Sequence, residues 1–290
     1  MSTVSSEVSA TEHGQRRPVT VVAVALVLLA LTLWSTYSVI ANAASDFLTT
    51  TLAALVLPSV LLATILAGAA AGVLAVGLLP WRAVLAGAAG GLAVGLVAMA
   101  GTLIAYHHGP AVPYVAAVIA VTGALGGATA ALRHVVVVTA GVAGGVAATA
   151  LGLVAAYFQN DLVDLFGNQE TVGTMAEAAS RLQLTTSVLS GVLAGVVAFA
   201  YLRRTGLALP WPLYPAAGAA AGVLTLVATL LGWLGRLPLT EIVEDYSEFD
   251  AQIIYSRLPE QINHGMIVLF AGAFVAMILV GRTMRRPAKE

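Results

Sequence analysis

The sequence predicts an all-α integral membrane protein with eight transmembrane helices. Charged residues make up 9% of the chain and hydrophobic residues 59%, whereas soluble domains carry about 25% charged residues. Apolar runs of about 20 residues, each able to cross a hydrocarbon core of about 30 Å, recur along the whole length. The basic residues collect in alternate connections between these runs, which is the charge pattern of a multi-pass membrane protein.

Eight apolar runs define the predicted spans. Pro80, Pro110, Pro210 and Pro238 lie at or near their junctions, where a missing backbone N–H costs least. Pro58 lies inside the second run and is expected to bend it. The predicted spans are Val19–Ala41, Leu52–Leu79, Ala83–Tyr106, Ala111–Leu132, Val135–Tyr157, Thr185–Leu202, Leu213–Leu234 and Gly265–Gly281.

Polar segments flank the spans at both ends of the sequence. Residues 1–18 are predicted to be a disordered cytoplasmic tail, and residues 283–290 a second cytoplasmic tail. Ala41-Asn42-Ala43 resembles the small-residue cleavage site of a signal peptide. The run before it is longer than the usual apolar region of a signal peptide, so a membrane span is favoured and cleavage is left open.

The distribution of arginine and lysine predicts the orientation, because cytoplasmic loops are enriched in both. With the N-terminus inside, ten basic residues lie inside and three outside, and eleven of the 14 acidic residues lie outside. Abundant Ala, Gly and Val, with arginine in place of lysine, is typical of a GC-rich bacterial genome, which predicts a bacterial plasma membrane. The inner residues are Arg16, Arg17, Arg82, Arg133, Arg203, Arg204, Arg282, Arg285, Arg286 and Lys289, and the outer ones are Arg181, Arg236 and Arg257.

Three polar markers recur in the same order and predict two tandem four-helix repeats in parallel orientation. They are Thr49-Thr50-Thr51 with Thr185-Thr186-Ser187, Leu79-Pro80-Trp81 with Leu209-Pro210-Trp211, and His108-Gly109 with His264-Gly265. Chance similarity between Ala/Gly-rich helices is the alternative. Residues 19–157 then form a first membrane half with five spans, and residues 185–282 a second half with three.

Glycines spaced four apart predict smooth helix faces that let backbones approach closely. Packing within this one chain is the favoured interpretation, and homo-oligomerisation or docking of another membrane subunit is the alternative. The glycines are Gly87, Gly91, Gly95, Gly141, Gly145, Gly191, Gly195, Gly218 and Gly222.

Two longer outer loops are predicted to carry amphipathic helices, at residues 158–184 and 236–263. In the second loop Ile242, Tyr246, Phe249 and Ile253 form an apolar stripe, and Thr240 is expected to cap the helix. Its acidic face is interpreted as a solvated surface, as a binding site for a protein partner, or as a Ca²⁺ or Mg²⁺ site. The acidic residues are Glu241, Glu244, Asp245, Glu248 and Asp250.

Three histidines near the outer surface are a candidate metal or pH-sensing cluster. If the repeat is genuine, His108 and His264 occupy matched positions, and His107 could join them in binding Zn²⁺. A histidine that hydrogen-bonds the loop backbone at a helix start is the alternative interpretation.

No predicted span contains Asp, Glu, Lys or Arg, which argues against ion-coupled transport. The chain has no Cys, no motif of a known enzyme site and no basic patch for nucleic acid, so no cofactor or nucleic-acid partner is expected. A non-enzymatic protein is favoured, and a lipid-modifying enzyme that uses the outer acidic residues is the alternative. The function predicted is therefore a non-enzymatic subunit that binds a membrane or extracytoplasmic protein through its outer loops, in an envelope or transport assembly. The alternative is a permease or channel for a small or lipid-like molecule between the two repeats.

Overall fold

The computed structural model is helical through nearly all of the residues that it describes. These are residues 4–40, 46–79, 82–105, 112–132, 134–166, 172–207, 209–244 and 247–283. Within them, eight helices are long and apolar enough to cross a membrane. The prediction of a multi-pass, all-α membrane protein with eight spans is confirmed at this level.

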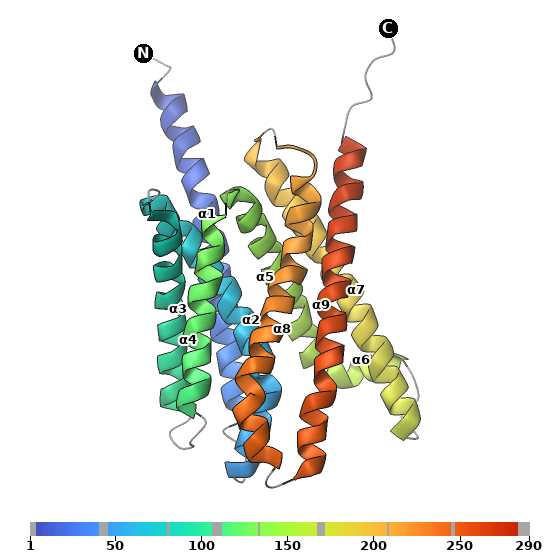
Figure 1. The fold of residues 1–290 in the computed structure, drawn as a ribbon. Coiled ribbons are helices and arrows are strands. Elements are labelled where there is room, and N and C mark those ends of the chain that lie inside the picture. The colour runs from blue at the N-terminus through green and yellow to red at the C-terminus, as the bar shows by residue number, and fades with distance from the viewer. Residues whose placement is uncertain are drawn as a thin grey trace. The chain divides into compact units, whose positions relative to one another are not determined.

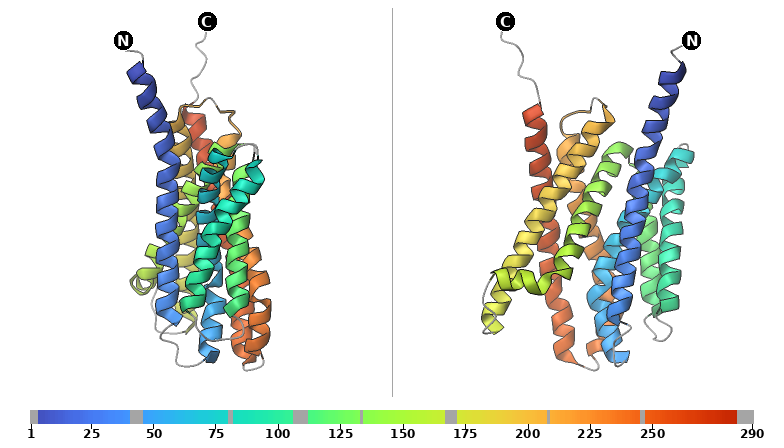
Figure 2. Two further views of the ribbon diagram at one scale, coloured as in Figure 1. Left: turned by 90° about the vertical axis from the view of Figure 1, so that its left-hand side faces the viewer. Right: turned by 180° about the vertical axis from the view of Figure 1, so that it is seen from behind.

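Figure 1 shows the helices in chain order. The long helices are α1 (Val4–Ile40), α2 (Asp46–Leu78), α3 (Ala83–Ala105), α4 (Val112–Ala128), α5 (Val135–Tyr157), α7 (Val172–Thr205), α8 (Leu213–Glu244) and α9 (Glu248–Thr283). The short α6 (Gln159–Phe166) packs against α7, as the right-hand view of Figure 2 shows.

Several helices extend beyond the predicted spans, and the expected loop at residues 236–263 is mostly helical. Helix α8 continues to Glu244 and α9 already begins at Glu248. At 36 residues, α9 is about 54 Å long at 1.5 Å per residue, well beyond the hydrocarbon thickness. Helix α1 begins at Val4, within the residues predicted to form a cytoplasmic tail. Backbone hydrogen bonds within a helix are local, so a polar composition alone does not end one.

Helix α7 ends where the sequence supplies a stop signal. Gly206 adopts a positive φ of 69°, a conformation that costs glycine little. Its N–H donates to the carbonyl oxygen of Arg203 at 3.3 Å. Arg203 and Arg204 lie in the last turn of α7, where positive charge suits the helix dipole.

The chain divides into two compact units. Unit 1 comprises residues 1–139 and 227–258, and unit 2 comprises residues 140–226 and 259–290. The divisions fall inside α8 and α9, so each of these helices contributes to both units. The two predicted halves and the tandem repeat stay predictions.

In unit 1, glycine allows α2, α3 and α4 to pack backbone to backbone (Figures 1 and 2). A Cβ added to Gly91 would lie 2.7 Å from Cα of Gly127, and a Cβ added to Gly87 would lie 2.6 Å from the carbonyl oxygen of Gly127. A Cβ on Gly95 would lie 2.6 Å from the carbonyl oxygen of Ala120. A side chain at these positions would clash, so glycine lets the backbones approach closely, and the dispersion contacts between them stabilise helix pairs in lipid, where the hydrophobic effect does not drive helices together.

The second part of α8 belongs to unit 1 because two glycines dock it there. A Cβ on Gly232 would lie 3.3 Å from the ring of Pro58 in α2. A Cβ on Gly235 would lie 3.1 Å from Val118 in α4 and 3.3 Å from Leu57 in α2. This contact positions the residues that follow Gly235, which form the candidate site described below.

In unit 2, glycines bring α7 and α8 against α9. A Cβ on Gly195 would lie 2.5 Å from the carbonyl oxygen of Gly272, and one on Gly191 would lie 2.7 Å from Cβ of Ala271. In α8, a Cβ on Gly218 would clash with the carbonyl oxygen of Gly272, and a Cβ on Gly222 would clash with the backbone nitrogen of Leu269. Both units therefore use the same packing device on different helices.

Candidate functional site

Arg236 is a buried cation inside α8, within the candidate span Leu213–Thr240. Its side chain is only 3% exposed. The sequence analysis ended the seventh span at Leu234 and placed Arg236 in the outer loop that follows, whereas in the structure α8 continues to Glu244, so Arg236 is helical. Arg236 belongs to the part of α8 in unit 1, where it lines a cavity together with residues of α9. Its Nε donates to the carbonyl oxygen of Gly232 at 3.2 Å.

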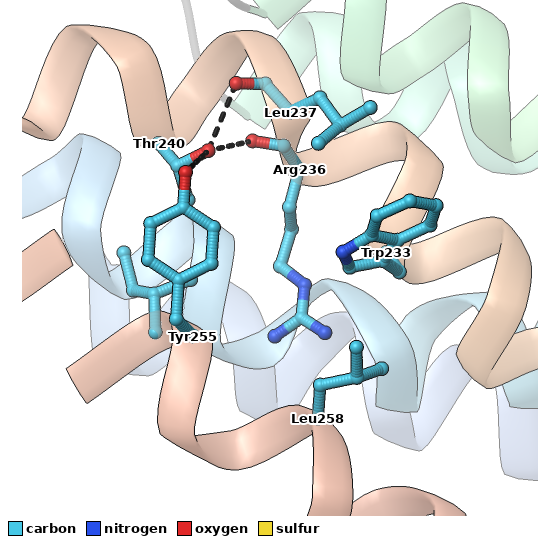
Figure 3. A pocket seen from close by; sticks show the side chains of 7 residues that line it. Trp233, Arg236, Leu237, Thr240, Tyr255 and Leu258 are labelled. Atoms are coloured by element: carbon cyan, nitrogen blue, oxygen red, sulfur yellow. Dashed lines mark hydrogen bonds between the residues drawn. The ribbon is translucent and has the colours of Figure 1, made fainter. Parts of the chain in front are cut away.

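A small cavity of about 10 Å³ lies beside the guanidinium group. Figure 3 shows the group pointing toward Tyr255 and Leu258, and the indole nitrogen of Trp233 on the side of its ring toward Arg236. This volume accommodates about one water-sized atom. The cavity is lined by Trp233, Arg236, Leu237 and Thr240 of α8 and by Ile254, Tyr255 and Leu258 of α9.

Thr240 links the two helices at this cavity. The sequence analysis expected Thr240 to cap a helix, but it lies inside α8 instead. Its hydroxyl lies 3.1 Å from the carbonyl oxygen of Arg236 and 2.9 Å from that of Leu237. The hydroxyl of Tyr255 donates to Oγ1 of Thr240 at 3.5 Å. Figure 3 shows these bonds side by side.

Ser247 is the residue that caps a helix in this segment. Its Oγ accepts a hydrogen bond from the backbone N–H of Asp250 at 3.3 Å, the geometry of an N-cap to the third helical residue. Glu248 and Asp250 lie in the first turn of α9, where acidic side chains suit the helix dipole. The expected single helix through residues 240–253 is therefore replaced by the end of α8 at Glu244 and the start of α9 at Glu248.

The described residues of the predicted acidic face are divided between the end of α8 and the start of α9. Glu244 and Glu248 are exposed and Asp250 is half-buried. The side chain of Glu241 and the whole of Asp245 lie outside the described residues. We call Glu244, Ser247, Glu248, Phe249 and Asp250 the acidic turn. Phe249, which was expected on the apolar stripe of the predicted helix, is 72% exposed.

The predicted histidine cluster is described only in part. His107 and His108 lie outside the described residues. His264 was expected just before the last span, but it lies inside α9, where its Nδ1 is 2.7 Å from Oγ of Ser187 in α7. Among the described residues, no three His, Cys, Asp or Glu side chains gather as a metal site would require. Zinc binding by these histidines stays a prediction.

A second hollow lies in unit 2 and is purely apolar. Its volume is about 470 Å³. All of its lining residues are apolar, so the hollow suits acyl chains of the surrounding lipid and not a polar ligand. They are Pro215, Phe270, Ala271, Ala273, Phe274 and Met277.

Sequence reasoning missed Arg236 and the Ser187–His264 pair for different reasons. Pro238 was interpreted as lying near a junction after a span that ends at Leu234, although Trp233, Leu237 and Thr240 continue the helical spacing around Arg236. Ser187 had no signal of its own, because nothing local relates it to a histidine 77 residues away. Comparison with known proteins adds no further assignment, since no family model, no curated protein and no solved structure matches the chain.

Proposed function

We propose that this chain is a non-enzymatic membrane subunit of an envelope or transport assembly that binds a protein partner through its acidic turn. The observation that carries the proposal is the exposure of Phe249, which is 72% exposed between Glu248 and Asp250. An aromatic side chain flanked by two carboxylates is poorly suited to face lipid hydrocarbon, because burying the carboxylates there is costly. It is well suited to anchor a protein interface.

The acidic turn is flanked on both sides by buried apolar residues. Leu239 and Val243 before the turn, and Ala251 and Ile254 after it, are each no more than 2% exposed. With this apolar face buried and Ser247 capping α9, binding would cost little ordering entropy. The complementary partner has an apolar pocket for Phe249 and basic side chains around it that face Glu244 and Glu248.

Close helix packing favours this role over permeation within each unit. Helices α2, α3 and α4 in unit 1, and α7, α8 and α9 in unit 2, meet at glycines that leave no space for a Cβ. A permease or channel acting between the two predicted repeats stays the alternative. Its test is solute flux into proteoliposomes, where uptake above that of protein-free vesicles would favour it.

Photo-crosslinking from position 249 tests partner binding. We expect p-benzoylphenylalanine at this position, in native membranes, to give a discrete adduct with a protein of basic surface. The double variant E244K/E248K should abolish this adduct, because charge reversal opposes basic residues on the partner.

Trp211 provides the matched control position. It is an exposed aromatic residue, 57% exposed, just before α8 and far along that helix from the acidic turn. The same crosslinker at position 211 should not give the adduct. An adduct from both positions, or one that survives E244K/E248K, would contradict the proposal.

A further inference from the structure

We infer that Arg236 and Trp233 bind a phosphate oxyanion at the cavity beside Tyr255, supplied by a phospholipid headgroup or by free phosphate. The inference is independent of partner binding at the acidic turn. It rests on a buried cation, a second hydrogen-bond donor beside it, and a cavity that fits one oxygen atom. It also rests on the position of Arg236 and Trp233 along α8.

The guanidinium group supplies the charge and the geometry. Arginine stays protonated at all physiological pH values, and its planar fork of N–H donors matches the oxygens of phosphate. At 3% exposure, Arg236 is shielded from bulk water, which strengthens attraction to an anion. The bond from Nε to the carbonyl oxygen of Gly232, at 3.2 Å, restrains the side chain, whose guanidinium group lies among the cavity-lining residues in Figure 3.

Trp233 supplies a neutral donor next to this charge. It lies three residues before Arg236, so both side chains project from neighbouring positions on one face of α8. Its indole N–H is a donor only, and Figure 3 shows that nitrogen on the side toward Arg236. A charged fork with a second N–H donor is suited to an oxyanion and poorly suited to a cation.

The cavity limits how much of the ligand enters. A volume of about 10 Å³ holds about one water-sized atom, which corresponds to a single phosphate oxygen. Leu237 and Tyr255 at its border are 42% and 48% exposed. The remaining phosphate oxygens and the organic group would lie outside this border.

The position along α8 makes phospholipid a natural source of phosphate. From Leu213 to Arg236, α8 rises by about 35 Å at 1.5 Å per residue, slightly more than the hydrocarbon thickness of about 30 Å. If the span begins near Leu213, Arg236 lies at the depth of the headgroups. Trp233, Tyr255 and Tyr114, whose hydroxyl reaches the carbonyl oxygen of Leu234, are the aromatic residues typical of that interface.

Fluorescence of Trp233 reports binding directly. The chain has four tryptophans, so W34F/W81F/W211F leaves Trp233 as the only reporter. The full chain in maltoside micelles is titrated with dihexanoylphosphatidylglycerol, with inorganic phosphate, and with phosphate-free dihexanoylglycerol. We expect a saturable change in emission with the phospholipid and none with dihexanoylglycerol. Saturation by inorganic phosphate alone would identify free phosphate as the source.

Variants of two arginines test the assigned residue. R236Q should weaken binding at least tenfold, and R236K several-fold, because lysine keeps the charge but lacks the planar fork. R257Q is the control, since Arg257 is an exposed arginine of α9, and it should bind as the parent does. If R236Q does not fold, R236K decides the question. An absent response in the parent, an equal response to dihexanoylglycerol, parental binding by R236K, or equal weakening by R257Q would overturn the inference.

Discussion

The hydroxyl of Tyr114 in α4 donates to the carbonyl oxygen of Leu234 in α8 at 3.4 Å. Leu234 lies four residues before Pro238, which has no N–H to donate to that carbonyl. A side chain of another helix thus replaces the missing backbone bond, as is common at proline in membrane helices. This contact is consistent with the continuation of α8 past Arg236 and across Pro238 to Glu244.

Removing the Tyr114 hydroxyl should destabilise the protein only while Pro238 is present. We expect Y114F to lower the free energy of unfolding by about 1 kcal/mol, the typical contribution of one hydrogen bond. In a P238A background the alanine N–H can donate to Leu234, so Y114F should cost little there. Reversible unfolding in detergent, measured for the four proteins of this cycle, gives the coupling energy.

Y157F is the control for this cycle, because Tyr157 is 84% exposed and should tolerate loss of its hydroxyl. An equal cost of Y114F in both backgrounds would show that Tyr114 does not compensate for Pro238.

Alanine at a glycine contact should be much more harmful than alanine at an open glycine. A Cβ on Gly91 would lie 2.7 Å from backbone atoms of Gly127, whereas Gly101 in the same helix has nothing within 4 Å of its Cβ position. We expect G91A to destabilise the protein by about 1–3 kcal/mol through overpacking. G101A should be neutral or stabilising by up to about 1 kcal/mol, because alanine favours helix. Unfolding in detergent tests both, and equal effects would contradict the packing argument.

The Ser187–His264 contact predicts which ring nitrogen of His264 carries the proton. Ser187 donates its hydroxyl hydrogen to the carbonyl oxygen of Gln183 at 2.7 Å. Its Oγ must then accept from Nδ1 of His264, so neutral His264 should hold its proton on Nδ1. Nitrogen NMR of ¹⁵N-histidine protein distinguishes the two tautomers, with H264Q assigning the signal. S187A should remove the preference, and an Nε2–H tautomer in the parent would contradict the assignment.

The orientation in the membrane can be tested with single cysteines, because the chain has none of its own. Leu207 follows the basic pair Arg203-Arg204, which is predicted to lie inside, and Gln252 follows the acidic turn. A membrane-impermeant maleimide should label Q252C in intact cells and L207C only after permeabilisation. The opposite pattern would reverse the predicted topology and place the acidic turn in the cytoplasm.

The sequence was sufficient to predict the class of fold. Eight apolar runs are enough to predict eight helical spans, because lipid cannot satisfy exposed backbone groups and a helix satisfies them internally. Span ends were less predictable. Pro238 and the charges after it were interpreted as a loop, but Tyr114 satisfies the carbonyl that Pro238 leaves, and α8 continues.

The candidate sites depended on tertiary structure. Tyr114 and Leu234 are 120 residues apart, and Ser187 and His264 are 77 apart. Hydrophobic patterns report which residues avoid water, but in an apolar helix every face does so, and the pattern does not say which face meets which neighbour. Gly232 and Gly235 pack against Pro58, Leu57 and Val118 of α2 and α4, and Arg236 beside them is buried. This packing depends on the surfaces of neighbouring helices, which neither segment determines alone.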